Sequence, residues 1–333
     1  GQLLNYQKAV DILKQEQVQN FLLMPEITGD SKLEATFESA LKKSLESPQA
    51  FRINGKIVVA SYVISSWTPQ QLAAFIGKIK AKLGDHFLFI ADLRHQCPVY
   101  EYQTGKITVS DIKAIESTIR SYLDVCDGIM FAGANHVMQY EQMDRYGADI
   151  NVDFLENFLT PIFKSVLTEP QYRNKLLGLS AAVAYINHYS GSCKLEDGTG
   201  AVRKTFELAM QAQPDFIESP EWNEYNENTC FQPTLNRSFA VQRITRYLID
   251  KYNQRPPQPN PGDDTAVPNL VVSYQQVVLL GERISLELLN IPDRNSDETY
   301  QVELYLKKLA GKVVQRFALV KFNAREMKDV KLM

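Results

Sequence analysis

The chain has 333 residues, 44% hydrophobic and 23% charged, a composition that excludes collagen-like, disordered and disulfide-dense classes of protein. Its 36 basic and 39 acidic side chains nearly cancel, to a formal charge of −3, and no basic block occurs, so we expect no nucleic-acid partner. The longest apolar runs are strand-sized, so we also expect no transmembrane segment.

Short apolar runs alternate with helical patterns along most of the chain. Each run is nearly continuous, as expected of strands buried on both faces of a parallel sheet. The runs are Phe21–Ile27, Lys56–Val63, Phe87–Leu93, Gly128–Gly133, Leu176–Val183 and Asp215–Pro220. Apolar residues with a period of 3.6 predict helices over Pro69–Leu83, Ser110–Leu123, Phe154–Leu167 and Arg237–Tyr252. We expect Thr68 to cap the first helix and Ser110 the second. This alternation predicts an α/β domain over residues 1–254.

A proline-rich stretch follows. Five of the 15 prolines fall between Arg255 and Pro268, which favours extended backbone and predicts a linker over 255–268. Beyond it, apolar and polar residues alternate, for example over Ile284–Leu288 and Val302–Lys307. Such alternation predicts antiparallel strands with one solvated face. Residues 269–333 are therefore expected to form a small all-β, sandwich-like module, and about 65 residues are few for a complete sandwich.

Polar and aromatic side chains follow the predicted strands at their carboxyl ends, where parallel α/β folds place their chemistry. Both tryptophans lie just beyond strand ends, which favours flat platforms that stack on sugar rings, although either could simply pack. Arg203 is expected to hold substrate or an active-site carboxylate, with a surface salt bridge as the simpler interpretation. The substrate-binding candidates are Glu26, Tyr62, Trp67, Asp92, Asn135, Tyr185, Arg203, Trp222, Asn223 and Tyr225.

Several catalytic motifs are missing from the sequence. It has no P-loop, no GxGxxG and no HExxH, and its histidines and cysteines lack metal-ligand spacing. Asp293–Asp297 begins like a calcium loop, but Glu298 stands where glycine is required, which favours a polar turn. We therefore expect no metal and no cofactor. Glu224 and Glu227 could supply the two carboxyl groups of glycoside cleavage, although acidic loop residues are more often merely solvated.

The segment from Asp215 to Pro233 contains the run Trp222-Asn-Glu-Tyr-Asn-Glu227. It resembles the last barrel strand of glycoside hydrolase family 71, the α-1,3-glucanases or mutanases, whose signature there is Trp-Asn-Asp-Tyr-Gly-Glu. It is also similar to the related family 99 endo-α-mannosidases, where the run is Asn-Glu-Trp-His-Glu. Asn54–Tyr62, Phe89–Asp92 and Asp127–Phe131 resemble earlier strands of these families, so the resemblance covers roughly residues 3–253.

The resemblance implies a TIM-type (β/α)8 barrel that hydrolyses an α-linked polysaccharide or oligosaccharide from within the chain, without a metal. It implies that Glu224 acts as base and Glu227 as general acid. It also implies two strands ahead of the first apolar run, which we expect to lie in a missing N-terminal region. A polymeric substrate implies a secreted, periplasmic or cell-surface protein, whose signal peptide lies outside this sequence. The alternative is a non-catalytic glycan-binding or structural surface protein built on a hydrolase-like barrel. The sequence leaves the oligomeric state, the exact glycan and the choice between retention and inversion open.

Overall fold

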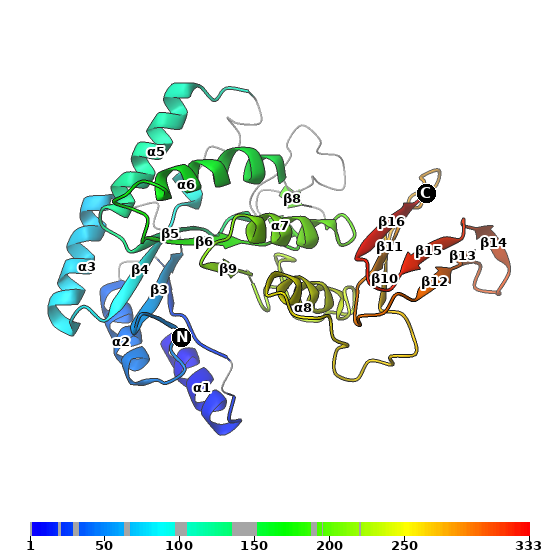
Figure 1. Ribbon diagram of the computed structural model, residues 1–333, viewed down its shortest axis with the longest axis horizontal. Helices are drawn as coiled ribbons and strands as arrows, with labels where there is room; N and C mark the ends of the chain where they lie inside the picture. The colour runs from blue at the N-terminus through cyan, green and yellow to red at the C-terminus, as the bar shows by residue number, and fades with distance from the viewer. Residues whose placement is uncertain are drawn as a thin grey trace. The chain divides into compact units, whose positions relative to one another are not determined.

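A computed structural model describes residues 2–18, 21–28, 33–62, 67–96, 105–134, 152–187, 192–194, 196–219 and 221–333 (Figure 1). Its internal contacts divide the chain into two compact units. The first takes its described residues from 1–141, 151–180 and 211–218, and the second takes them from 181–210 and 219–333. This division differs from the predicted domain boundary at residue 254, which stays a prediction.

The first unit is built on a parallel sheet. Its strands, in spatial order, are β1 (Glu26–Thr28), β3 (Lys56–Tyr62), β4 (Phe87–Asp92), β5 (Gly128–Phe131), β6 (Leu176–Ser180) and β9 (Phe216–Glu218). Each is parallel to its neighbours, so the six predicted strands are confirmed, the first of them shortened. Because spatial order follows chain order, right-handed crossovers all place their helices on one face of the sheet. This is the strand order of a (β/α) barrel.

The helices of the first unit are α1 (Gln2–Gln15), α2 (Leu33–Glu46), α3 (Pro69–Leu83), α5 (Val109–Leu123) and α6 (Thr160–Leu167), with a π-helical start to α6 at η4 (Phe154–Leu159). Of these, α2, α3, α5 and α6 supply four of the crossovers, α1 precedes β1, and α7 (Gly200–Gln211), described below, lies between β6 and β9. Figure 1 shows α2, α3, α5 and α6 following one another around the outside of the sheet. The predicted helices over 69–83, 110–123 and 154–167 are confirmed.

Both faces of the sheet are covered by apolar side chains. Val58, Ala60, Ile90, Met130 and Ala132 form one fully buried apolar cluster. On the opposite face, the rings of Phe87 and Phe89 lie 5.4 and 6.1 Å from the ring of Phe37 on α2, measured between centroids. Burial on both faces explains why these strands are continuous apolar runs in the sequence.

In the part of the chain that the structure describes, the sheet is open, with β1 and β9 as its edges. Its six parallel strands in barrel order agree with the predicted barrel without its first two strands, and the presence of those two strands ahead of this sequence stays a prediction. A short strand, β2 (Arg52–Ile53), pairs antiparallel with β3. Asn54 and Gly55 join the two strands with φ angles of 51° and 80°, as a two-residue hairpin turn requires.

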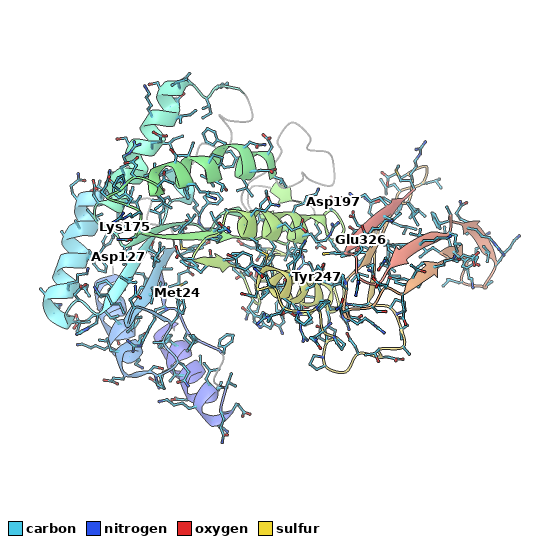
Figure 2. The ribbon with its side chains drawn as sticks, in the orientation of Figure 1. Met24, Asp127, Lys175, Asp197, Tyr247 and Glu326 are labelled. Atoms are coloured by element: carbon cyan, nitrogen blue, oxygen red, sulfur yellow. The ribbon has the colours of Figure 1, made fainter. Side chains whose placement is uncertain are left out.

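Aspartates fix the register at the amino ends of the strands. Asp127, just before β5, accepts a hydrogen bond from the N–H of Phe89 at 2.9 Å, and Asp215, just before β9, accepts one from Leu177 at 2.8 Å. Lys175 donates to the carbonyl of Cys126 at 2.5 Å, and Figure 2 shows Asp127 and Lys175 close together. These side chains are occupied with holding the sheet, which leaves the carboxyl ends for other tasks.

Thr68 caps α3 as predicted. Its Oγ1 accepts a hydrogen bond from the N–H of Gln71 at 3.2 Å, and its own N–H donates to Gln71 Oε1 at 2.9 Å. The predicted cap of the next helix is wrong: α5 begins at Val109, and Thr108 caps it through Asp111. Ser110 lies inside the first turn because Thr108, not Ser110, has the extended backbone of an N-cap residue.

Replacing Thr68 with alanine is expected to lower the free energy of unfolding by about 1 kcal/mol, because the N–H of Gln71 in the first turn loses its hydroxyl acceptor. Thr68→Ser, which keeps the hydroxyl, serves as the matched control. Urea unfolding followed by circular dichroism measures both variants. Equal stability of the alanine and serine variants would show that the cap contributes nothing.

The second unit carries an antiparallel β module. Its strands are β10 (Leu270–Tyr274), β11 (Leu286–Asn290), β12 (Thr299–Val302), β13 (Tyr305–Lys307), β14 (Val313–Arg316), β15 (Val320–Asn323) and β16 (Lys328–Leu332). β11 lies between β10 and β16, and β12–β15 and β13–β14 form further pairs. All these pairs are antiparallel, as predicted. The predicted solvated face is wrong for β11, because Glu287 is buried with the leucines beside it.

The same unit contains α7 (Gly200–Gln211) for most of its length, α8 (Ala240–Tyr252) and a hairpin of β7 (Tyr185–Asn187) and β8 (Ser192–Lys194). The helix predicted over 237–252 is thus confirmed as α8, starting at Ala240.

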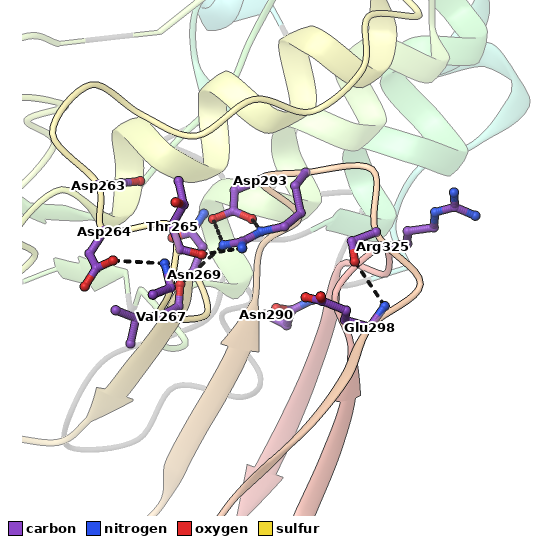
Figure 3. A network of polar contacts seen from close by, with 12 residues as sticks. Asp263, Asp264, Thr265, Val267, Asn269, Asn290, Asp293, Glu298 and Arg325 are labelled. Atoms are coloured by element: carbon purple, nitrogen blue, oxygen red, sulfur yellow. Dashed lines mark hydrogen bonds and ion pairs between the residues drawn. The ribbon is translucent and has the colours of Figure 1, made fainter.

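The proline-rich stretch is anchored by charged contacts. Arg243 of α8 pairs with Asp263 and also donates to the side chain of Asn269 at 2.7 Å. Arg294 donates to the carbonyl of Thr265 and forms an ion pair with Asp293 at 2.8 Å. Figure 3 shows Asp263, Thr265, Asn269 and Asp293 around this segment. The segment predicted as a linker is therefore tied both to α8 and to the β module.

Candidate active site

A buried polar cluster joins the carboxyl ends of neighbouring strands in the first unit. Arg94, which is 8% exposed, donates through Nε to Asp92 Oδ2 at 2.6 Å. Asp92 Oδ1 accepts the backbone N–H of Arg94 at 3.1 Å and that of Ala132 at 3.3 Å. The N–H of Asp92 donates to Ser61 Oγ at 3.0 Å. Residues at or just beyond the ends of β3, β4 and β5 are thus held together by hydrogen bonds.

The guanidinium of Arg94 is the positive charge of this cluster. Its guanidinium carbon lies 4.2 Å from the ring centre of Tyr62. Burial by itself lowers the pKa of Arg94, but the charges of Asp92, Tyr62 and Glu218 outweigh it and raise the pKa. Its Nη2 atom is buried and makes no hydrogen bond within the protein as far as the structure describes it. The sheet end therefore holds a positive charge beside an aromatic ring.

Three predicted site residues lie on strands of the first unit. Tyr62 is half-buried against Arg94, and Asp92 is fully buried and holds Arg94 by hydrogen bonds. The predicted substrate contacts of both residues stay predictions. Glu26 is exposed at the start of edge strand β1. The structure brings Tyr62 and Asp92 together through Arg94, a residue that the sequence did not single out.

Trp67 packs instead of forming an open platform. Its ring meets Phe75 of α3 edge-on, with ring centres 5.1 Å apart. Its carbonyl oxygen accepts a hydrogen bond from the hydroxyl of Tyr122 at 2.7 Å. These contacts favour the packing interpretation of Trp67 over a platform that stacks on sugar rings. Asn135 lies outside the described residues.

An acidic loop, residues 221–232, follows β9 in the chain and belongs to the second unit. The N–H of Phe231 donates to the carbonyl of Glu221 at 2.9 Å, and that of Gln232 donates to the carbonyl of Trp222 at 2.8 Å, which closes the loop at its base. Between these bonds the chain turns at 225–228. Such pairing gives the loop a defined shape.

The acidic loop presents the predicted catalytic and aromatic residues. Trp222 is 60% exposed, Tyr225 is 55% exposed, and Asn223 is exposed as well. Glu224 and Glu227 are each partly exposed. The loop thus carries two partly exposed carboxylate residues and two exposed aromatic rings, and the catalytic and binding roles predicted for them stay predictions.

Arg237 holds the far arm of the acidic loop. Its side chain is 6% exposed, and its Nη2 donates to Glu196 Oε1 at 2.7 Å and to the carbonyl of Asn228 at 2.7 Å. Asn228 has a left-handed φ of 57° and donates in turn to Glu196 at 3.1 Å. The N–H of Ile186 on β7 donates to the carbonyl of Glu227 at 2.7 Å. Arg237 was not predicted as a site residue, because only its folded surroundings reveal its role.

Replacing Arg237 with lysine is expected to make the acidic loop about tenfold more susceptible to proteolysis, because a lysine cannot reproduce the fork that binds Glu196 and Asn228 together. The matched control is Arg255→Lys, an exposed arginine paired with Asp250. Limited proteolysis with mass spectrometry of the fragments measures the effect. Equal cleavage of both variants within 221–232 would contradict a clamping role.

Two further predicted residues have structural roles in the second unit. Arg203 lies in the first turn of α7, and its guanidinium pairs with Glu287 at 2.9 Å and Asp329 at 3.0 Å. These contacts occupy Arg203 against the β module, so we withdraw it as a substrate contact. Tyr185 is 6% exposed on β7, which gives its ring no open face.

Among the described residues, no group of histidines, cysteines and carboxylates is arranged to hold a metal ion. Asp293, the first residue of the calcium-like stretch, is buried in its ion pair with Arg294. No helix within the described ranges is both long and apolar enough to cross a membrane.

No family model matches this sequence, and no curated protein is significantly similar to it. The chain is similar to solved structures. One is the GH99 endo-alpha-mannosidase from Bacteroides thetaiotaomicron, with 15% identity over 70% of this chain and 66% of that chain and a TM-score of 0.46. A complex of the GH99 endo-alpha-mannosidase from that organism with BIS-TRIS-Propane gives 16% identity, 70% coverage of each chain and a TM-score of 0.48.

A glycoside hydrolase-like protein matches with 9% identity, over 65% of this chain and 61% of that chain, at a TM-score of 0.47. The chain therefore spans between 61% and 70% of the length of these three neighbours. These neighbours are glycoside hydrolases or hydrolase-like proteins. The barrel order of the sheet rests on the strand pairing described above, and membership of family 71 stays a prediction.

Proposed function

We propose that the protein is an endo-acting glycoside hydrolase that cleaves an α-linked polysaccharide of the α-1,3-glucan or α-mannan type. The observation that supports this most is the acidic loop, which carries two accessible carboxyl groups and two exposed aromatic rings directly after the last strand of a sheet in barrel order. In such sheets the segments after the strands carry the chemistry. The similarity of Trp222–Glu227 to the family 71 and 99 signatures supports the same assignment.

In the proposed mechanism, the two carboxyl groups have different roles. Glu227 protonates the leaving glycosidic oxygen. Glu224 acts as base on the attacking water in an inverting reaction, or as nucleophile on the anomeric carbon in a retaining one, where water then hydrolyses the glycosyl-enzyme. Trp222 and Tyr225 offer flat apolar faces to sugar rings, and Asn223 offers an amide to their hydroxyl groups. A carboxyl separation of about 5 Å would give retention, and one of about 6.5–9.5 Å inversion.

The proposed substrate class also places the protein outside the cytoplasm, since polymeric glycans are met there. We therefore propose a secreted, periplasmic or cell-surface protein. Fractionation of cells that produce the natural full-length protein, followed by immunodetection, tests this location. Recovery from the cytosolic fraction alone would contradict it.

Hydrolysis of α-1,3-glucan and of α-mannan tests the function. New reducing ends should appear together with fragments of intermediate length, because an endo-acting enzyme cuts within the chain. Glu303→Gln, at an exposed carboxylate of the β module, is the matched control and should keep full activity. Tight glycan binding with no hydrolysis, unchanged in the Glu224→Gln and Glu227→Gln variants, would instead support the non-catalytic glycan-binding protein.

A further inference from the structure

The second unit contains a cavity of about 470 Å³ that the proposed reaction does not use. Its walls come from the turn at residues 196–199, the start of α8 and strands β10 and β11. Figure 2 labels Asp197 on one of these walls. Pockets of about 300–1,000 Å³ hold small organic ligands, so the cavity has the volume for a sugar segment.

Each charged side chain that lines the cavity has an ion-pair partner. Glu196 forms an ion pair with Arg237 at 2.7 Å, and Asp197 forms one with Lys331 at 2.6 Å. Glu287, the remaining carboxylate of the lining, is paired with Arg203. A cationic ligand would have to displace these arginines and lysines, and an anionic ligand would face three carboxylates. The lining therefore favours a neutral ligand.

The remaining polar groups suit a polyhydroxylated ligand. Gln276 donates to Asn236 at 2.9 Å, and this bond joins the segment after β10 to the segment before α8. Amide groups of this kind both donate and accept, as sugar hydroxyl groups do. Tyr274, at the end of β10, is 66% exposed and lines the cavity, so its ring is accessible to a ligand there. Amides beside an open aromatic ring match the mixed polar and apolar surface of a sugar.

The acidic loop contributes one residue, Asn228, to the wall of the cavity. Asn228 follows Glu227 directly, lines the cavity and is held by Arg237 and Glu196, which line it as well. A glycan chain that lies along the acidic loop would thus be continued by the cavity. All these residues belong to the second unit, so the path does not depend on how the two units are placed.

We propose that this cavity is an auxiliary subsite that binds a remote segment of a neutral α-linked glycan through Tyr274 and Gln276. The inference rests on the proposed function, which supplies the glycan. It gives the β module a part in substrate binding, because Tyr274 lies at the end of β10. The subsite strengthens the binding of chains long enough to reach it and leaves short substrates unaffected.

Binding is measured with the Glu227→Gln protein, so that the glycan stays intact, by calorimetry with disaccharides and with long oligosaccharides of the α-1,3-gluco and α-manno series. Adding Tyr274→Ala is expected to weaken binding of the long oligosaccharide about tenfold and to leave binding of the disaccharide unchanged. Gln276→Ala should act in the same direction, and its side chain is exposed enough to leave the fold intact. Tyr252→Ala, at an exposed tyrosine outside the cavity lining, is the control.

Equal affinity of the parent and both cavity variants for the long oligosaccharides would overturn the subsite, as would an equal loss for disaccharides. The two proposals fail separately. Absence of hydrolysis by the unmodified protein, together with Tyr274-dependent binding, would leave the subsite standing and remove the hydrolase. Normal hydrolysis by the unmodified protein, with the KM for long substrates unchanged in Tyr274→Ala, would support the hydrolase and overturn the subsite.

Discussion

Replacing Glu227 with glutamine is expected to reduce the hydrolysis of α-linked polysaccharide by about 10²- to 10⁴-fold, because the amide cannot give a proton to the leaving oxygen. The side chain is partly exposed on a loop that backbone hydrogen bonds hold, so the substitution should leave stability unchanged. Initial rates of reducing-end formation measure the loss, and thermal unfolding confirms that the variant is folded.

The two glutamates are told apart by the leaving group. An aryl glycoside with an acidic phenol leaves without help, so Glu227→Gln should regain much of its rate on that substrate. Glu224→Gln should stay slow on both substrates, because the attack on the sugar still lacks its base or nucleophile. An unchanged rate in either single variant would remove that residue from the mechanism.

Replacing Glu287 with alanine is expected to destabilise the second unit by about 3 kcal/mol, because the N–H of Thr199 loses its acceptor and Arg203 keeps only Asp329 as a partner. The side chain of Glu287 is 5% exposed and accepts hydrogen bonds from Arg203 Nη2 at 2.9 Å and from the N–H of Thr199 at 2.7 Å. Denaturant unfolding followed by tyrosine and tryptophan fluorescence measures the loss.

Two comparisons make this prediction specific. Glu303→Ala, at an exposed carboxylate, should change the free energy of unfolding by less than about 0.5 kcal/mol. The double change Arg203→Met with Glu287→Leu should recover most of the stability, because no buried charge is then left unpaired. A Glu287→Ala protein as stable as Glu303→Ala would show that the ion pair does not hold α7 to the β module.

The parallel sheet could be predicted because its strands are buried on both faces, and burial of this kind leaves continuous apolar runs such as Lys56–Tyr62. The Asn54-Gly55 pair is a sequence typical of a hairpin turn, and both residues have the positive φ angles that such a turn requires. The alternation of polar and apolar residues around β11 predicted a solvated face, which is wrong for this strand. Glu287 is a charged residue of the kind usually found at the surface, and its ion pair with Arg203 allows it to be buried. Helices α1 and α2 were not predicted, although Phe37, Leu41 and Leu45 recur at every fourth residue along α2, which is a helical spacing.

Candidate site residues could be predicted where their position depends only on where they fall in the sequence relative to the end of a strand. Placing function at the strand ends led to Tyr62, Asp92 and the acidic loop, since the end of a strand can be read from the sequence. Arg94 and Arg237 were missed because each gains its role from partners on other elements, such as Tyr62 for Arg94 and Glu196 for Arg237. No local pattern marks an arginine that will be buried.

Proton NMR tests most directly whether Glu224 and Glu227 together cleave an α-glycosidic bond. Soluble α-1,3-gluco- and α-manno-oligosaccharides are incubated with the protein while their anomeric signals are recorded. We predict that new reducing-end signals grow with the unmodified protein on at least one series and stay absent with the Glu224→Gln, Glu227→Gln double variant. Unchanged spectra of both series beside folded protein, or equal growth with the double variant, would contradict the assignment.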